Sequence, residues 1–283
     1  MLSDQATEIL AVVGFAALGL ALAAYLLSLR RRLPLTLAQS ALYGLNVLVA
    51  KLLWRARISG PLPVPPGQGA VIVCNHRSSV DPCFTQMATT RPVHWMVAKE
   101  YCDHRSFGWF LRMVEVIPTN RAGIDTAATK AAIRCAQNGG LVGVFPEGRI
   151  NTTGRVLLPG RPGAALIALK ARVPIVPCYV RGSPFAKVLV RPLVMPAKVE
   201  LKIGRPIDLA AFYGRQRERE VLEEITRRVL QEMARLAGCP DFQPELAGRF
   251  YKPGLDRPLS PPPRATILGT PAGTPGSQTR QLP

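Results

Sequence analysis

The stretch that decides the fold is AVIVCNHRSSVDP, residues 70–82. Its first five residues are apolar and mostly β-branched or small, which is typical of a short buried strand. The polar residues that follow include Ser78, Ser79 and then Asp81-Pro82, a pattern that marks the start of a helix. The stretch therefore predicts a strand, a tight turn and a helix.

His76 and Asp81 are the candidate catalytic residues of this corner. A positioned histidine can take a proton from a hydroxyl near neutral pH, and a nearby carboxylate fixes the ring's tautomer and stabilises the imidazolium. Residues five apart lie about 140° apart on one continuous helix. The two side chains can meet if His76 ends the strand, Ser78 or Ser79 caps a helix and Asp81 lies in its first turn. Taken alone, the pair fits a capping aspartate beside a surface histidine better.

Short β-rich runs alternate with helical patterns along the rest of the chain. The candidate strands are Ala70–Cys74, Val93–Ala98, Val114–Pro118, Leu141–Phe145, Pro174–Tyr179, Val188–Val194 and Lys198–Ile203. The candidate helices are Pro82–Thr90, Ser106–Met113, Asp125–Gln137, Gly163–Ala171 and Glu218–Leu236. This alternation predicts an α/β fold with a sheet covered by helices on both faces. The length of 283 residues accommodates one such domain with appendages.

The net charge of +18 indicates anionic partners. Nucleic acid is disfavoured, because the chain has no zinc-finger spacing, no RNP-like motif and no basic tract beyond residues 30–32. The chain also lacks a Walker A loop and a GxGxxG motif, so nucleotide hydrolysis and dinucleotide binding have no support. None of the six cysteines forms a CxxC pair, which favours buried thiols of a reducing compartment over disulfides or a metal site.

Residues 9–29 form an uncharged apolar segment long enough to cross about 30 Å of hydrocarbon. Asp4 and Glu8 precede it and three arginines follow it, which is opposite to the charge pattern of a signal peptide. We therefore expect an uncleaved transmembrane anchor over residues 1–32, with the rest of the chain on the cytoplasmic side. A buried helix of a soluble domain is the alternative.

The segment 33–68 is expected to hold a membrane-interfacial helix and a Pro-rich linker. Leu35–Ile58 is apolar but interrupted by polar residues, and it ends in Trp54 and two arginines, which suits the headgroup level of a membrane. A second, shallower membrane helix is the alternative. Residues 69–250 then form the α/β domain, and the Pro-, Gly-, Ser- and Thr-rich residues 251–283 are expected to be a disordered tail.

Two further motifs lie where strands are expected to end. Residues 145–149 read FPEGR, and they place a carboxylate, a glycine and a guanidinium at one edge of the sheet. Gly148 lets a ligand approach the backbone closely, and Arg149 offers a planar fork for phosphate. An ordinary strand-exit turn with a surface ion pair is the alternative. The run Ile117–Arg121 likewise presents Arg121, which alone would be a solvated surface charge.

Four blocks in this order resemble the motifs of the glycerolipid acyltransferase family, which includes the 1-acylglycerol-3-phosphate acyltransferases. The blocks are His76-x4-Asp81, Ile117–Arg121, Phe145–Arg149 and Val173–Pro177. The resemblance covers roughly Lys51 to Leu209, and the first and third blocks together make it specific.

The resemblance implies a role for each matching residue. His76 would be the general base that deprotonates the acceptor's hydroxyl, and Asp81 would orient it. The residues implied to bind the acceptor's phosphate and shape its pocket are Arg121, Glu147, Gly148 and Arg149. The Val173–Pro177 block would border the acyl channel. The co-substrate would be an acyl-CoA or acyl-carrier-protein thioester, with no bound cofactor or metal.

The chain departs from the family's common pattern in two of the blocks. Glu115 stands where a glycine is common, and Asn120 where an acidic residue is common. In the third block Arg149 follows Gly148 directly, which resembles the branch that acylates 2-acylglycerophosphoethanolamine.

The leading hypothesis is an O-acyltransferase that converts 1-acyl-sn-glycerol-3-phosphate to phosphatidic acid. Its partners would be membrane lipids, a lysophospholipid acceptor and an acyl donor. Acceptors with another headgroup remain open. A hydrolase with the same two residues is a further alternative, although the chain has no GxSxG motif. The non-enzymatic alternative is a membrane lipid-binding protein.

Overall fold

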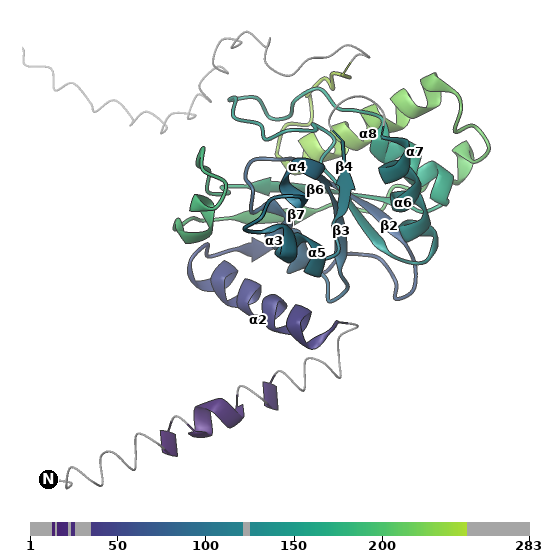
Figure 1. Ribbon diagram of the computed structural model, residues 1–283. Helices are drawn as coiled ribbons and strands as arrows, with labels where there is room; N and C mark the ends of the chain where they lie inside the picture. The colour runs from purple at the N-terminus through teal and green to yellow at the C-terminus, as the bar shows by residue number, and fades with distance from the viewer. Residues whose placement is uncertain (1–12, 15, 22–23, 26–34, 121–124, 248–283) are drawn as a thin grey trace, which may run out of the picture.

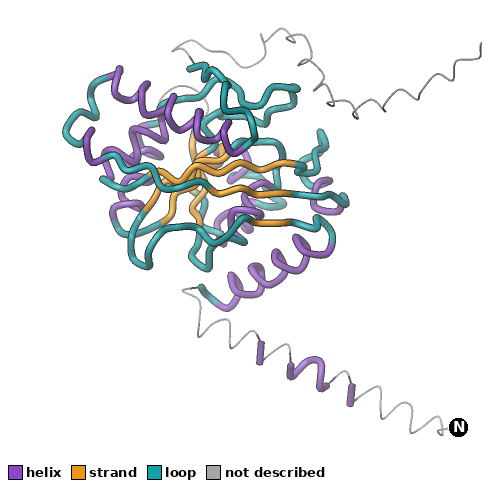
Figure 2. Tube along the Cα trace, turned by 180° about the vertical axis from the view of Figure 1, so that it is seen from behind, coloured by secondary structure: helices purple, strands orange, loops and turns teal. Residues whose placement is uncertain are grey.

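A seven-stranded sheet forms the centre of the described structure, with strand order β1-β7-β6-β2-β5-β3-β4 (Figures 1 and 2). The computed structural model describes residues 13–14, 16–21, 24–25, 35–120 and 125–247. The strands are β1 (Arg57–Ile58), β2 (Ala70–Cys74), β3 (Val93–Ala98), β4 (Ile117–Thr119), β5 (Leu141–Val144), β6 (Ile175–Arg181) and β7 (Glu200–Ile203). Neighbouring strands pair in parallel except β6 and β7, which are antiparallel.

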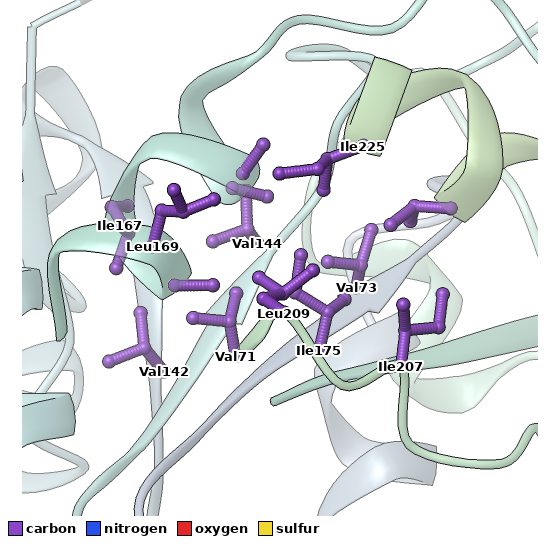
Figure 3. Packing of buried hydrophobic residues seen from close by; sticks show 14 of the residues in the cluster. Val71, Val73, Val142, Val144, Ile167, Leu169, Ile175, Ile207, Leu209 and Ile225 are labelled. Atoms are coloured by element: carbon purple, nitrogen blue, oxygen red, sulfur yellow. The ribbon is translucent and has the colours of Figure 1, made fainter. Parts of the chain in front are cut away.

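Helices cover both faces of this sheet, which confirms the predicted α/β class. The helices are α2 (Leu37–Leu52), α3 (Asp81–Gln86), α4 (Lys99–Cys102), α5 (Gly108–Met113), α6 (Thr126–Gln137), α7 (Gly163–Ala171) and α8 (Arg219–Leu236), with short 3-10 turns η1 (Arg191–Val194) and η2 (Ala210–Phe212). On one face, α6, α7 and α8 pack on Val71, Val73, Val142 and Val144 (Figure 3). On the other face, α2 and α3 pack on the alternate residues of the same strands.

The central strands are apolar along their whole length because both of their faces are buried. All five residues of β2 and all four of β5 are buried. Such continuous apolar runs are typical of parallel sheets that helices sandwich. Each strand and helix predicted between residues 70 and 181 has a counterpart in the structure, and Gly163–Ala171 has the observed bounds. Two predictions are wrong in their bounds, because Val114–Pro118 overlaps β4 only at its last two residues and Pro82–Thr90 extends beyond the end of α3, and α4 was not predicted.

The predicted strand Val188–Val194 is wrong. These residues lie in the β6–β7 loop, residues 182–199, where Arg191–Val194 forms the 3-10 turn η1. Pro192 occupies the start of that turn and has no N–H to donate to a sheet. The strand that pairs with β6 is β7, formed by the next apolar run along the chain.

The predicted helix Leu35–Ile58 is confirmed over Leu37–Leu52 and wrong at its end. Thr36 caps the helix in a reciprocal capping box with Gln39. Arg57 and Ile58 instead form β1, in parallel register with β7. Trp54 was expected at a membrane headgroup level, but it is 1% exposed and packs edge-on against Phe84, with ring centroids 5.2 Å apart.

Several predicted features lie outside the described residues. Most of the expected anchor, residues 9–29, and the whole tail, residues 251–283, belong to these parts, as does Arg121. Among the described residues, no helix has the length and apolar character needed to cross a bilayer. The six cysteines are free thiols, and Cys74, Cys102 and Cys178 are buried.

Candidate active site

The predicted catalytic residues lie at the carboxyl ends of the central parallel strands. His76 follows β2 after a single residue, and Phe145 and Glu147 follow the neighbouring β5. In open α/β sheets this edge is where ligands bind, because the strand ends and the loops after them leave a crevice there. The fold therefore brings the first and third sequence motifs together.

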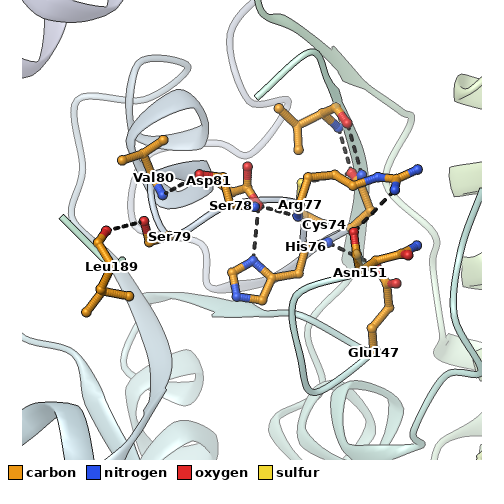
Figure 4. Close-up of polar contacts among 12 residues, drawn as sticks. Cys74, His76, Arg77, Ser78, Ser79, Val80, Asp81, Glu147, Asn151 and Leu189 are labelled. Carbon is orange, nitrogen blue, oxygen red and sulfur yellow. Dashed lines mark hydrogen bonds and ion pairs between the residues drawn. The ribbon is translucent and has the colours of Figure 1, made fainter. Parts of the chain in front are cut away.

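His76 and Asp81 meet as the sequence predicts. The His76 Nδ1 lies 3.0 Å from Asp81 Oδ2 (Figure 4). Asp81 is fully buried, whereas the His76 side chain is 17% exposed. A carboxylate oxygen only accepts, so Nδ1 holds the proton and Nε2 keeps its lone pair. Nε2 has no hydrogen-bond partner among the described residues, so this atom is available as a base.

Asp81 also holds the turn that precedes it. Its Oδ2 accepts hydrogen bonds from the backbone N–H of Arg77, at 2.6 Å, and of Ser78, at 2.7 Å. The prediction that Asp81 lies in the first turn of a helix is confirmed, because α3 begins at this residue. The prediction that Ser78 or Ser79 caps this helix is wrong: Val80 is the N-cap, with no side-chain cap bond. The turn is closed by Asp81 itself.

An aromatic stack supports the His76 ring from one side. The ring lies parallel to Phe145, with centroids 3.9 Å apart, and Phe145 stacks on Trp95 at 4.3 Å. These three rings come from the ends of β2 and β5 and from β3. Stacking against a buried wall fixes the orientation of the imidazole. Composition alone could not reveal this stack, because it joins three separate stretches of chain.

Glu147 occupies a different position from the one that the resemblance implies. It is 1% exposed, and its two oxygens accept the backbone N–H groups of His76 and Leu158, each at 2.9 Å. Burial raises the pKa of Glu147 to about 7, while the two backbone N–H groups act in the opposite direction. Both oxygens are thus used inside the protein, and the carboxylate fixes the backbone that holds the His76 ring.

Arg77 ties the loop after the third motif to the first motif. Its guanidinium donates to the backbone oxygens of Asn151, Thr153 and Arg155, at 3.3, 3.0 and 2.9 Å. In return the N–H of Asn151 donates to the His76 carbonyl at 2.7 Å. Sequence reasoning passed over Arg77, although an arginine beside the histidine was a visible signal.

Asn75 is a second residue that sequence reasoning missed. It is fully buried, and its side-chain amide bonds to both backbone groups of Val180, donating at 2.9 Å and accepting at 2.7 Å. The amide continues the β2–β6 pairing for one more step after the strand has ended. The polar residue before His76 therefore fixes the direction in which the chain leaves the sheet.

Gly148 and Arg149 lie on the turn directly after Glu147. Gly148 has φ +67°, in the left-handed region that favours glycine, and it is exposed. Arg149 is half-buried.

On the α8 side of the sheet edge, a hollow of about 460 Å³ is lined by Arg77, Tyr179, Arg181 and the 151–154 loop, among other residues. Among the described residues, no group of three or more His, Cys, Asp or Glu side chains could hold a metal ion.

Comparison with known proteins agrees with this architecture. A family model described as Acyltransferase matches residues 55–181. The 1-acyl-sn-glycerol-3-phosphate acyltransferase of Bacillus subtilis (strain 168) is 28% identical over 171 residues, covering 59% of this chain and 82% of that protein. The enzyme of the same name from Streptococcus pneumoniae is 28% identical over 200 residues, covering 68% and 71%.

A solved structure has the same fold. The crystal structure of the 1-acyl-sn-glycerophosphate (LPA) acyltransferase PlsC from Thermotoga maritima matches with a TM-score of 0.53, at 24% identity, over 69% of this chain and 80% of that one. The fold and the matched family model together define an acyltransferase. More particularly, the two bacterial relatives that it resembles are glycerolipid acyltransferases, at 28% identity over 171 and 200 residues.

Proposed function

We propose that this acyltransferase moves a fatty acyl group from an acyl-CoA or acyl-carrier-protein thioester to the free hydroxyl of a lysophospholipid. The acceptor we favour is 1-acyl-sn-glycerol-3-phosphate, which gives phosphatidic acid. The observation that supports this most strongly is the 3.0 Å contact between His76 Nδ1 and Asp81 Oδ2, which leaves Nε2 with a lone pair beside an open sheet edge. The names of the two bacterial relatives support the choice of acceptor.

The proposed reaction is a direct transfer between two bound substrates. His76 Nε2 takes the proton of the acceptor's hydroxyl while that oxygen forms a bond to the thioester carbonyl carbon. Asp81, held in place by the N–H groups of Arg77 and Ser78, stabilises the imidazolium. When the tetrahedral intermediate collapses, the C–S bond breaks and the leaving thiolate takes the proton from His76. The ester and the free thiol are the products.

Binding of the acceptor's phosphate is proposed for Arg121, Gly148 and Arg149. The half-buried guanidinium of Arg149 follows an exposed glycine at the same sheet edge as His76, which suits a bidentate contact with phosphate. Glu147 is proposed as a positioning residue for His76, since both of its oxygens accept backbone N–H groups.

The substrates are amphiphiles, so we propose that the enzyme works at the cytoplasmic surface of a membrane. Leu45, Leu48 and Leu52 of α2 are exposed by 55%, 55% and 72%. Their spacing places them on one side of the helix. An apolar side chain on that side gains free energy when it enters the headgroup and acyl boundary of a bilayer. This supports an interfacial position for α2.

The test is a product analysis with the full-length protein in lipid vesicles. Labelled acyl-CoA and acyl-carrier-protein are each offered with 1-acyl-sn-glycerol-3-phosphate, 2-acylglycerophosphoethanolamine or no acceptor. Labelled phosphatidic acid is the expected product. Labelled phosphatidylethanolamine alone would move the assignment to the other headgroup branch. Free fatty acid without any acylated lysolipid would identify a hydrolase, and no product from any pair would favour a lipid-binding protein.

A further inference from the structure

The β6–β7 loop, residues 182–199, exposes a cluster of apolar side chains. The loop patch consists of Phe185, Val188, Val190, Leu193 and Val194, which are exposed by 43, 59, 52, 47 and 74%. Large apolar clusters with polar rims on a protein surface mark places where another molecule binds. No part of the reaction proposed above uses these residues.

The loop is fixed to the body of the protein in a way that keeps these side chains outside. Its Leu189 carbonyl accepts a hydrogen bond from Ser79 Oγ at 2.7 Å (Figure 4). Its Pro192 carbonyl accepts one from Trp54 Nε1 at 3.3 Å. The N–H of Ala197 donates to the carbonyl of Leu53 at 3.2 Å. These backbone contacts, together with the buried Pro192 and Val199, attach the loop to the body, while the five side chains of the loop patch remain exposed.

The loop patch lies next to the carboxyl end of α2. Leu52, the last residue of α2, is 72% exposed and directly precedes Leu53, which bonds to the loop. In Figure 1 the green loop lies beside the end of α2 at the left of the view. The exposed leucines of α2 and the loop patch therefore form neighbouring parts of one apolar margin of the molecule.

The charged residues around the loop patch indicate that its partner is anionic. Every charged residue between 181 and 199 is basic and exposed: Arg181, Lys187, Arg191 and Lys198. Exposed apolar side chains surrounded by basic groups suit an anionic lipid surface. The apolar side chains can enter the acyl region, while the basic groups contact the lipid phosphates. A second copy of this chain would instead present the same positive charges, which would repel.

We infer that the loop patch inserts into the headgroup and acyl boundary of an anionic phospholipid bilayer. It forms a membrane contact beside the one proposed for α2. Since Ser79 lies between His76 and Asp81 and bonds to Leu189, insertion also places the catalytic corner at the bilayer surface. The inference goes beyond acyl transfer, and its test requires no turnover.

The test measures the depth of a single added tryptophan in the full-length protein bound to vesicles. V194W places the probe on the most exposed residue of the loop patch. R228W is the matched control, on an exposed position of α8, which packs on the opposite face of the sheet from α2. The vesicles contain phosphatidylcholine and phosphatidylglycerol with bromine atoms on the acyl chains. The emission that V194W adds to that of the parent, which has three tryptophans of its own, should shift to shorter wavelength and be quenched, while the emission added by R228W should stay unchanged.

A pair of charge variants tests the electrostatic part. K187S/R191S and R217S/R228S lower the net charge by the same amount, but only the first pair lies in the loop. In the V194W background, K187S/R191S should decrease the inserted fraction up to about thirty-fold, and R217S/R228S should leave it nearly unchanged. Equal quenching of V194W and R228W would overturn the inference, as would a blue shift of V194W without vesicles that rises with protein concentration. Acyl transfer is not involved in any of these readouts.

Discussion

One oxygen of Asp81 organises the catalytic corner. Its Oδ2 accepts from His76 Nδ1 and from the N–H groups of Arg77 and Ser78. The residue proposed to orient the base is therefore also the residue that holds the turn. Substitutions at this position should separate these two roles. Stabilising the imidazolium needs the negative charge of Asp81, whereas holding the turn needs only a hydrogen-bond acceptor.

Asp81→Asn should keep the fold and lose most of the activity. An amide oxygen can take the place of Oδ2 and accept the two backbone N–H groups, but it brings no charge to stabilise the imidazolium. The expected loss in kcat is about 10²–10⁴-fold with an almost unchanged melting temperature. Asp81→Ala should lose activity and also stability, by about 1–3 kcal/mol for each buried N–H that loses its acceptor. Equal melting temperatures of the two variants would contradict this separation.

Glu147 should make the stability of the folded protein depend on pH. Burial raises its pKa from 4.5 to about 7, so between these values the folded protein holds a proton that the unfolded chain has released. The stabilisation is complete below pH about 4.5 and is lost as pH rises through about 7. Glu147→Gln cannot titrate. The stability of the parent relative to this variant should therefore fall over this window by up to about 3 kcal/mol, measured by denaturant titration at each pH. A difference that is flat with pH would contradict the raised pKa.

At the residue scale, a contact could be predicted from the sequence where two residues of complementary chemistry lie close together in the chain. The pairing of His76 with Asp81 followed from their separation and the helix that starts after the strand. The position of Glu147 could not be predicted, because its partners are the N–H of His76, at the end of another strand, and the N–H of Leu158, eleven residues further along the same irregular loop between β5 and α7. The resemblance alone suggested a phosphate contact that its burial does not favour.

At the scale of elements, β5 places the aromatic stack under His76. Gly143 of β5 leaves the space that the Trp95 ring fills, and a Cβ at this position would overlap that ring. Trp95 in turn stacks on Phe145, and Phe145 on His76. A glycine in the middle of a strand thus makes room for the stack that supports the His76 ring.

Gly143→Ala should disturb both stability and catalysis. The added methyl group forces Trp95 to move, and overpacking of this kind costs about 1–3 kcal/mol. Phe145 and His76 should follow, which would lower kcat more than it raises KM. Gly163→Ala is the control, because a Cβ at that helix start has no atom within 4 Å. Melting curves and acyl-transfer rates of the two variants check this. If Gly143→Ala changed neither the melting temperature nor the acyl-transfer rate, the aromatic stack would not position the His76 ring.

Elements were predictable where hydrophobic periodicity and burial agree. Gly163–Ala171 is buried on most sides and begins and ends where the pattern does. Val188–Val194 has the composition of a strand, yet it lies in a loop and most of its side chains are exposed. An apolar run predicts an apolar environment, and it does not distinguish a protein core from a lipid surface.

At the scale of the whole molecule, the net charge and the exposed apolar side chains both favour contact with an anionic lipid surface. The net charge of +18 suits an anionic surface, and the exposed leucines of α2 neighbour the loop patch. Composition predicted an anionic partner, and the relatives that the chain matches are named for a phosphate-bearing lipid acceptor. It could not predict which surface faces the lipid, because that depends on how residues 37–52 and 182–199 come together in the fold.

The most direct test of the central claim is acyl transfer by His76→Ala, with His94→Ala as a matched control. The two histidine side chains are 17% and 18% exposed, and each Nδ1 lies 3.0 Å from an oxygen, of Asp81 and of the Glu115 backbone respectively. Both variants should give the circular dichroism spectrum of the parent. Labelled lysolipid acylation should fall by at least about 10²-fold in His76→Ala and stay close to the parent rate in His94→Ala. Turnover by His76→Ala at the parent rate would contradict the assignment of His76 as the general base.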